Sequence, residues 1–168
     1  MTNYKILITD GLDETGQSIL RASAIVEDRK DILAEDLLNA IPDYDGLIVR
    51  GRTKVTAPIM EAASRLKVIG RAGVGVDNID LEAAKKQNIT IVNAPISTSL
   101  AVAELTFGLM LTLAREIPRA DAGMKQGKWL KKELERTELY GKTLCMVGLG
   151  NIGTEIAKRA LAFGMKVV

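Results

Sequence analysis

The segment Gly148-Leu149-Gly150-Asn151-Ile152-Gly153, near the end of the 168-residue chain, could hold a phosphate group. Its glycines have the spacing G-x-G-x-x-G and lie between a strand-like run, 142–147, and a helical pattern, 151–163. In such a turn the first glycine allows a tight bend, the second lets the backbone approach a pyrophosphate, and the third allows close helix packing. Strand, spacing and helix together predict the first turn of a dinucleotide-binding fold.

The acidic residue that usually completes this turn binds the adenosine ribose about 20 residues farther on. Counted from Gly150, that position falls at or just beyond Val168, the last residue of the sequence. The turn therefore predicts a nicotinamide dinucleotide without deciding between NAD and NADP. Only the first strand, turn and helix of the fold are expected in this chain.

Two loops in the first half of the chain could hold a small anion. Arg50 and Arg52 follow a predicted strand, and their guanidinium groups could grip a carboxylate or phosphate, although two solvated charges are the simpler alternative. Gly73 and Gly75 follow the next strand, and their backbone N–H groups could point at an anion. Ligands of open α/β sheets gather at the carboxyl ends of strands, where both loops are expected.

The composition limits the chemistry. The chain has no histidine, so acid–base work by an imidazole cannot run on this chain alone. The one cysteine, Cys145, lies in an apolar run and is expected to be a small core residue. A single cysteine and a start, MTNYKILITD, without a visible signal peptide fit a reducing, cytoplasmic setting. No metal site is predicted.

Charge and hydropathy argue against two classes of partner. The 23 basic and 21 acidic residues are interspersed and leave a net charge of +2, which favours neither nucleic acid nor a membrane surface. The most apolar run, residues 100–114, is shorter than the roughly 20 residues of a membrane-spanning helix. It is predicted to be a buried helix.

Short β-rich runs alternate with helical patterns before residue 93, which predicts a parallel sheet with helices on both faces. Strands are expected at 4–9, 25–27, 46–49, 67–70 and 89–92, and helices at 14–22, 31–41, 56–66 and 80–88. Asp31, Thr56 and Asp80 are the expected N-caps.

A long helix should follow from about Thr98 to Gly123, kinked or divided by Pro118. Residues 125–138 are rich in Lys and Glu and are expected to form a solvated short helix and connector, before a new βα unit begins at Gly141. That unit is expected to expose apolar surface and to self-associate through it. The residues concerned are Leu144, Val147, Ile156 and Val168.

The chain resembles the D-isomer-specific 2-hydroxyacid dehydrogenases. The matching segments are LIVRGRTKVT, LKVIGRAGVGVDNIDLEAAKK, VNAPISTSLAVAELTFGLML and ELYGKTLCMVGLGNIGTEIAKRALAFGMKVV. The resemblance implies a flavodoxin-like substrate domain over 1–97, a long crossover helix and connector over 98–140, and the truncated start of a Rossmann domain over 141–168.

The resemblance also implies the chemistry: NAD-dependent oxidation of a small anionic 2-hydroxy acid. D-3-phosphoglycerate is the favoured substrate, and glyoxylate or hydroxypyruvate reduction is the rival activity. It implies that Arg50 and Arg52 face the substrate's charged groups. It further implies that backbone amides of Gly73, Val74 and Gly75 bind the substrate carboxylate, with Val74 also beside the nicotinamide. The pyrophosphate would contact Gly148, Gly150, Asn151, Ile152 and Gly153.

The family's catalytic set is a histidine paired with a carboxylate, plus an arginine, all in the later part of the cofactor domain. This sequence has no histidine, so no catalytic residue is assigned within it and the isolated chain is expected to be catalytically incomplete. Relatives commonly dimerise through the cofactor domain and long helix, so a homodimer is expected of the full-length parent. The alternative is a non-catalytic module that binds a small anion or associates with a partner chain.

Overall fold

The computed structural model describes residues 4–168 of the chain. They form two compact units, one ending at Ser97 and the other beginning at Thr98. No helix within the described residues is long and apolar enough to cross a bilayer.

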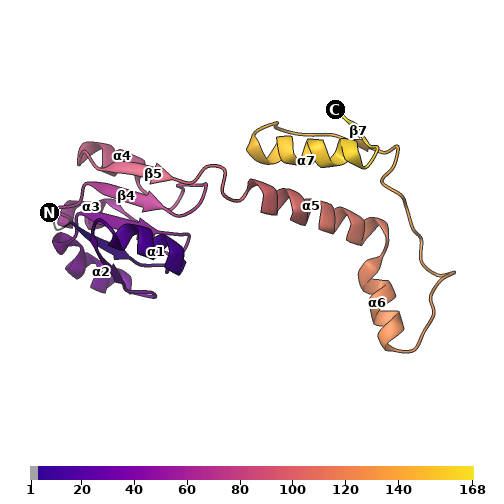
Figure 1. The fold of residues 1–168 in the computed structure, drawn as a ribbon, viewed down its shortest axis with the longest axis horizontal. Helices are drawn as coiled ribbons and strands as arrows, with labels where there is room; N and C mark the ends of the chain where they lie inside the picture. Colours follow the sequence, from indigo (N-terminus) through magenta and orange to yellow (C-terminus); the bar gives the residue numbers. More distant parts are fainter. Residues whose placement is uncertain (1–3) are drawn as a thin grey trace. The chain divides into compact units, whose positions relative to one another are not determined.

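The first unit is a five-stranded parallel sheet with the strand order β2-β1-β3-β4-β5. Figure 1 labels β4 and β5 of this sheet. This flavodoxin-like order confirms the predicted α/β fold class. The strands are β1 (Lys5–Ile8), β2 (Ile25–Asp28), β3 (Gly46–Val49), β4 (Val68–Arg71) and β5 (Thr90–Asn93). The helices are α1 (Glu14–Arg21), α2 (Ala34–Ala40), α3 (Ala57–Ala62) and α4 (Leu81–Lys86), with a 3₁₀ turn, η1 (Ile41–Asp43).

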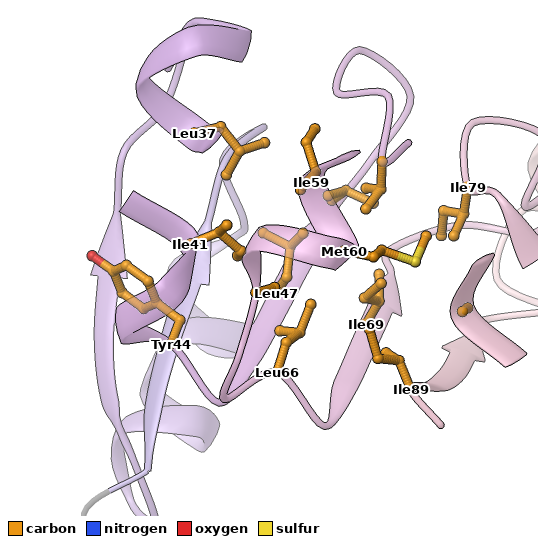
Figure 2. Close-up of a cluster of buried hydrophobic side chains, with 14 of the residues drawn as sticks. Leu37, Ile41, Tyr44, Leu47, Ile59, Met60, Leu66, Ile69, Ile79 and Ile89 are labelled. Carbon is orange, nitrogen blue, oxygen red and sulfur yellow. The ribbon is translucent and has the colours of Figure 1, made fainter. Parts of the chain in front are cut away.

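A row of apolar side chains crosses the sheet. Leu7 of β1 is level with Leu47 of β3, which is level with Ile69 of β4, and each is almost completely buried. Successive side chains of a strand point to opposite faces, so the row lies on one face, where side chains of α2, α3 and α4 join it in one core (Figure 2). Each such side chain contributes about 1.5–3 kcal/mol by leaving water, which holds the register of the strands.

Helix α1 begins at Glu14 as predicted, whereas α2, α3 and α4 begin one to three residues later than expected. Of the three predicted caps, Asp31 is wrong, and Thr56 occupies the N-cap position without a capping bond. Asp31 has a left-handed backbone (φ 69°), and Leu33 precedes α2 without a side-chain capping bond. Thr56 does precede α3, but its side chain makes no capping bond. Asp80 caps α4 as predicted, since its carboxylate accepts the N–H of Ala83 at 2.9 Å.

The second unit contains α5 (Ser99–Ala114), α6 (Ile117–Lys125), α7 (Asn151–Ala162) and two short parallel strands, β6 (Thr143–Leu144) and β7 (Lys166–Val167). The predicted long helix is divided, with Glu116 in the left-handed region (φ 48°) between α5 and α6 and Pro118 in the first turn of α6. The helix predicted within 125–138 is absent from the described structure. Gly127, also left-handed (φ 71°), follows the end of α6.

A small core joins α5, α7 and the two strands. Phe107 packs against Phe163 with ring centroids 5.1 Å apart, and Ala160 and Met165 are buried beside Phe107. The strand predicted over 142–147 is shorter than expected. Cys145 is exposed rather than buried, which corrects the prediction. It alternates with Leu144, whose side chain joins this core, and therefore points to the opposite face of the strand.

Apolar side chains are exposed in this unit, although not all those predicted. Val147 and Val168 are exposed, whereas Leu144 and Ile156 are half-buried against the small core. Helix α5 also carries an exposed apolar stripe at the helical spacing of four residues, formed by Leu105, Leu109 and Leu113.

We expect the chain to self-associate in a concentration-dependent manner, because covering the stripe on α5 removes apolar surface from water. Light scattering over a range of concentrations measures this. Replacing Leu105 and Leu109 by Gln should reduce the association. Leu33→Gln, a change at an equally exposed leucine of the first unit, should leave it unaltered. A compact monomer at every concentration would contradict the expectation.

Candidate functional site

The strand order of the first unit reverses between β1 and β3, and open α/β sheets bind ligands at such a point, beyond the carboxyl ends of the strands. Asp10 lies two residues beyond the end of β1, and Arg50 directly follows β3. The loop 50–53 therefore lies at the position where the fold itself provides a crevice.

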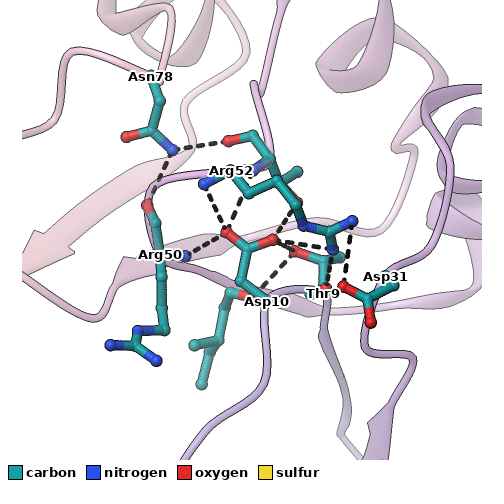
Figure 3. Close-up of polar contacts among 8 residues, drawn as sticks. Thr9, Asp10, Asp31, Arg50, Arg52 and Asn78 are labelled. Atoms are coloured by element: carbon teal, nitrogen blue, oxygen red, sulfur yellow. Dashed lines mark hydrogen bonds and ion pairs between the residues drawn. The ribbon is translucent and has the colours of Figure 1, made fainter.

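The carboxylate of Asp10 holds this loop (Figure 3). Its Oδ2 accepts three backbone N–H groups, from Arg50 (2.8 Å), Arg52 (3.2 Å) and Thr53 (3.1 Å). Its Oδ1 accepts the Thr53 hydroxyl and, at 3.2 Å, Nη2 of the Arg52 guanidinium. Sequence reasoning missed Asp10. Its place just after the first strand, at the point where the strand order reverses, is the signal that could have identified it.

Burial and hydrogen bonding oppose each other at Asp10. The side chain is only 5% exposed, and burial raises the pKa of a carboxyl group. The hydroxyl and N–H of Thr53, the N–H of Arg50 and the charge of Arg52 together outweigh this effect. The pKa of Asp10 therefore lies below its ordinary value of 3.8, and the group is a carboxylate at neutral pH.

Asn78 holds the same loop through hydrogen bonds to its backbone carbonyl groups. Its Nδ2 donates to the carbonyl oxygens of Arg50, at 3.1 Å, and Thr53, at 2.7 Å. The sequence analysis did not assign Asn78 to the site. The loop 50–53 is thus held by one side chain through its N–H groups and by another through its carbonyl groups.

The two arginines predicted to face the substrate have different surroundings. Nη2 of Arg52 donates to the carbonyl oxygen of Thr9 at 2.6 Å, and Nη1 lies 3.5 Å from a carboxylate oxygen of Asp31. Arg50 is exposed, and its guanidinium points away from the Asp10 cluster (Figure 3). The Arg52 side chain is 46% exposed, but its guanidinium is bound to groups of the protein, whereas the Arg50 guanidinium is directed away from them.

A third arginine, Arg71, lies beside the glycine loop at the end of β4. A Cβ atom at Gly73 would overlap the Arg71 guanidinium, and one at Gly51 would lie 3.9 Å from its Nη2. Arg71 Nε is buried and has no hydrogen-bond partner among the described residues. Arg71 thus lies next to both loops, although the sequence analysis did not assign it to the site.

The predicted substrate amides lie in this glycine loop, which β5 and the residue after it hold in place. Asn93 Nδ2 donates to the carbonyl oxygen of Val74 at 2.6 Å, and the N–H of Ala94 donates to that of Gly73 at 2.9 Å. The first unit therefore brings Arg50, Arg71 and the loop containing Gly75 together at the carboxyl ends of β3 and β4. Such an arrangement of guanidinium and backbone N–H groups suits a small anion.

In the second unit the geometry of the glycine turn fits a pyrophosphate. Gly148 has a positive φ of 102°, which other residues rarely adopt. No described atom lies within 4 Å of a Cβ atom built at Gly148 or Gly150, so the space above the turn is open. Asn151 and Ile152 form the start of the 12-residue helix α7, whose N-terminus favours negative charge. Within the described residues no group of three or more potential metal ligands is gathered.

Comparison with known proteins connects these features. Residues 6–164 match the family model of the D-isomer specific 2-hydroxyacid dehydrogenase catalytic domain. The chain is 54% identical over 164 residues to the D-3-phosphoglycerate dehydrogenase of Methanocaldococcus jannaschii, covering 98% of this chain and 31% of the relative. It is 48% identical over 169 residues to the hydroxypyruvate reductase of Thermotoga maritima, covering 100% of this chain and 55% of the relative.

A solved structure shows the same fold. An acyclic imino acid reductase in complex with NADPH and D-Arg is 28% identical, with a TM-score of 0.88 over 97% of this chain and 54% of that one. The chain therefore spans between about a third and about half of the length of these proteins.

We expect Gly153→Ala to destabilise the second unit by about 1–3 kcal/mol, because the new Cβ atom would lie 2.5 Å from the backbone carbonyl oxygen of Gly148. Gly150→Ala is the matched control, since its Cβ atom meets open space and its φ of −78° suits alanine. Urea unfolding of both variants measures the difference. Equal stability of the two variants would contradict the expectation.

Asp10 should make the stability of the first unit depend on acid. Its pKa is lowered in the folded state, so its contribution is complete above the ordinary value of 3.8 and is lost as the pH falls through the folded pKa. We expect wild type to exceed Asp10→Asn by about 2–3 kcal/mol near neutral pH, and by progressively less below about pH 3.8. Urea unfolding across this range tests it, with Asp43→Asn, at an exposed carboxylate, as the control for net charge. A difference that stays constant with pH would contradict it.

Proposed function

Because the chain belongs to the D-isomer specific 2-hydroxyacid dehydrogenase family, we propose that it supplies the substrate loops and pyrophosphate-binding turn of an NAD-dependent enzyme that oxidises D-3-phosphoglycerate to 3-phosphohydroxypyruvate in serine biosynthesis. The observation that carries the proposal is the exposed Arg50 together with Arg71 beside the glycine loop, whose Nε has no hydrogen-bond partner within residues 4–168. The 54% identity to a D-3-phosphoglycerate dehydrogenase supports the choice of substrate.

The substrate carries two anionic groups, and the first unit offers two kinds of donor. Backbone N–H groups of Val74 and Gly75 would hold the carboxylate next to C2, whereas the N–H of Gly73, predicted to join them, donates to the carbonyl oxygen of Arg71 at 2.7 Å. The guanidinium groups of Arg50 and Arg71 would hold the phosphate, to which a planar fork of donors is well matched. Binding at both ends fixes the orientation of the C2 hydroxyl, which is the contribution of this chain's residues to the reaction.

The cofactor proposal rests on the turn over Gly148–Gly153. When bound, the nicotinamide would accept hydride from C2. The hydroxyl proton needs a base, and since this chain has no histidine, we expect a residue outside these 168 to take it. NADP is the alternative nucleotide, as the NADPH complex of the acyclic imino acid reductase illustrates for a relative. The proposal includes a cytoplasmic homodimer, as the family resemblance implies.

A second candidate is reduction of hydroxypyruvate or glyoxylate, which the 48% identity to a hydroxypyruvate reductase favours. These substrates share the carboxylate and the reacting carbon but carry no phosphate. The two candidates therefore differ in their need for Arg50.

The test compares turnover of D-3-phosphoglycerate and glyoxylate by the full-length protein. Arg50→Gln should raise the KM for D-3-phosphoglycerate about 10- to 100-fold, the value of one or two charge-assisted hydrogen bonds, with a smaller effect for glyoxylate. Arg21→Gln, at an exposed arginine paired with Glu14 on α1, is the control and should change neither KM.

Three results would point elsewhere. Turnover of glyoxylate without turnover of D-3-phosphoglycerate would favour the reductase. Anion binding without turnover of either would favour a non-catalytic binding module. An unchanged KM in Arg50→Gln would remove Arg50 from the substrate site.

A further inference from the structure

The backbone N–H groups of the loop 50–53 already bind an anionic group of the same chain, the carboxylate of Asp10. Three backbone N–H groups that converge on one point form a typical anion-binding concavity, and here they converge on Oδ2 of Asp10. The position that a substrate oxygen could take among these amides is filled by the carboxylate of the same chain. These amides are therefore occupied by Asp10, and a substrate can contact only the side chains that the loop directs to solvent.

Arg52 belongs to this internal assembly. Its guanidinium donates to Asp10 and to the carbonyl oxygen of Thr9, and Asp31 lies within ion-pair distance. With two carboxylates and a carbonyl oxygen around it, the positive charge of Arg52 is largely matched within the protein. Although the Arg52 side chain is 46% exposed, its guanidinium already has acceptors within the protein, so binding a substrate anion would compete with them.

Arg50 is arranged differently. Its backbone N–H donates to Asp10 at 2.8 Å and its carbonyl oxygen accepts from Asn78 at 3.1 Å, so both polar groups of its backbone are held. The side chain projects from this fixed backbone and points away from the cluster (Figure 3). A residue fixed in this way loses little backbone freedom when its side chain binds a ligand.

We propose that Asp10 is a positioning residue for the substrate loop, and that Arg50 rather than Arg52 meets the substrate anion. Asp10 does not touch the substrate. It holds the loop so that Arg50 is presented before binding, and the inference rests on the proposed function. An asparagine cannot replace it, because one oxygen and one NH₂ group cannot accept both the three amides at Oδ2 and the hydroxyl and guanidinium donors at Oδ1.

The chain contains a matched control for the loss of a buried carboxylate. Asp45 has a side chain that is 9% exposed, and it accepts the N–H of Lys5 and a guanidinium nitrogen of Arg65, each at 3.0 Å. It directly precedes β3, at the amino end of the strand whose carboxyl end leads into the loop 50–53. Asp45→Asn should therefore lower stability without changing the loop.

The experiment titrates D-3-phosphoglycerate into the full 168-residue chain and follows amide and arginine Nε–H signals by NMR. Asp10→Asn should weaken binding about tenfold, the equivalent of one lost hydrogen bond of about 1.4 kcal/mol, whereas Asp45→Asn should bind as wild type does. Amide hydrogen exchange at residues 50, 52 and 53 should accelerate in Asp10→Asn alone. Wild-type affinity in Asp10→Asn, or an equal loss in Asp45→Asn, would overturn the positioning role.

Two arginine variants separate this inference from the proposed function. Arg50→Gln should lose more affinity than Arg52→Gln, and the reverse order would overturn the assignment of Arg50. If Arg50→Gln binds normally, Arg50 is not in the substrate site and this inference fails. If the wild-type chain shows no saturable shift, the proposed function fails and this inference with it. If Arg50→Gln is weakened and Asp10→Asn is not, only the role of Asp10 fails.

A milder variant covers the case in which Asp10→Asn does not fold. Thr53→Val removes one hydroxyl donor to Oδ1 and leaves the carboxylate in place. We expect it to weaken binding about two- to threefold, because the remaining donors still hold the loop. Unchanged binding together with unchanged amide exchange in the loop would overturn the proposal.

Discussion

A buried carboxylate must be matched by donors, and at Asp10 this requirement shapes the candidate site. The strand order brings the end of β1 next to the end of β3, and the donors for Asp10 all come from the loop that follows β3 or from Thr9. The loop cannot move without exposing the carboxylate or leaving it partnerless. The apolar row through Leu47 fixes the strands. Asp10, which follows β1, then fixes the loop after β3 by accepting its N–H groups.

The sheet could be predicted from the sequence because its strands are buried apolar runs with clear breaks. The bounds predicted for β3 agree with the structure, and those of the other strands in the first unit differ from it by at most one residue at each end. The predicted β-strand before the glycine turn was too long, and Cys145 was wrongly placed in the core. An apolar run alone does not say which of its two faces is covered.

The positions of the two loops could be predicted from the sequence, but the hydrogen bonds that hold them could not. The arginine and glycine loops were located because they follow strands, yet Asp10 and Asn78 were missed, since their bonds to the loop join residues 25 to 43 positions apart. Spacing cannot show which of Arg50 and Arg52 binds within the protein and which is directed to solvent, because both follow the same strand in the same loop. Only their different partners distinguish them.

The double anchoring of the Arg50 backbone has a consequence for substitutions at residue 50. The bonds to Asp10 and Asn78 use only main-chain atoms of residue 50, so the shape of the loop is independent of the side chain at that position. A change of side chain at residue 50 would therefore leave these two bonds in place. If Arg50 meets the substrate as proposed, substitutions there would alter recognition at little cost to the shape of the loop.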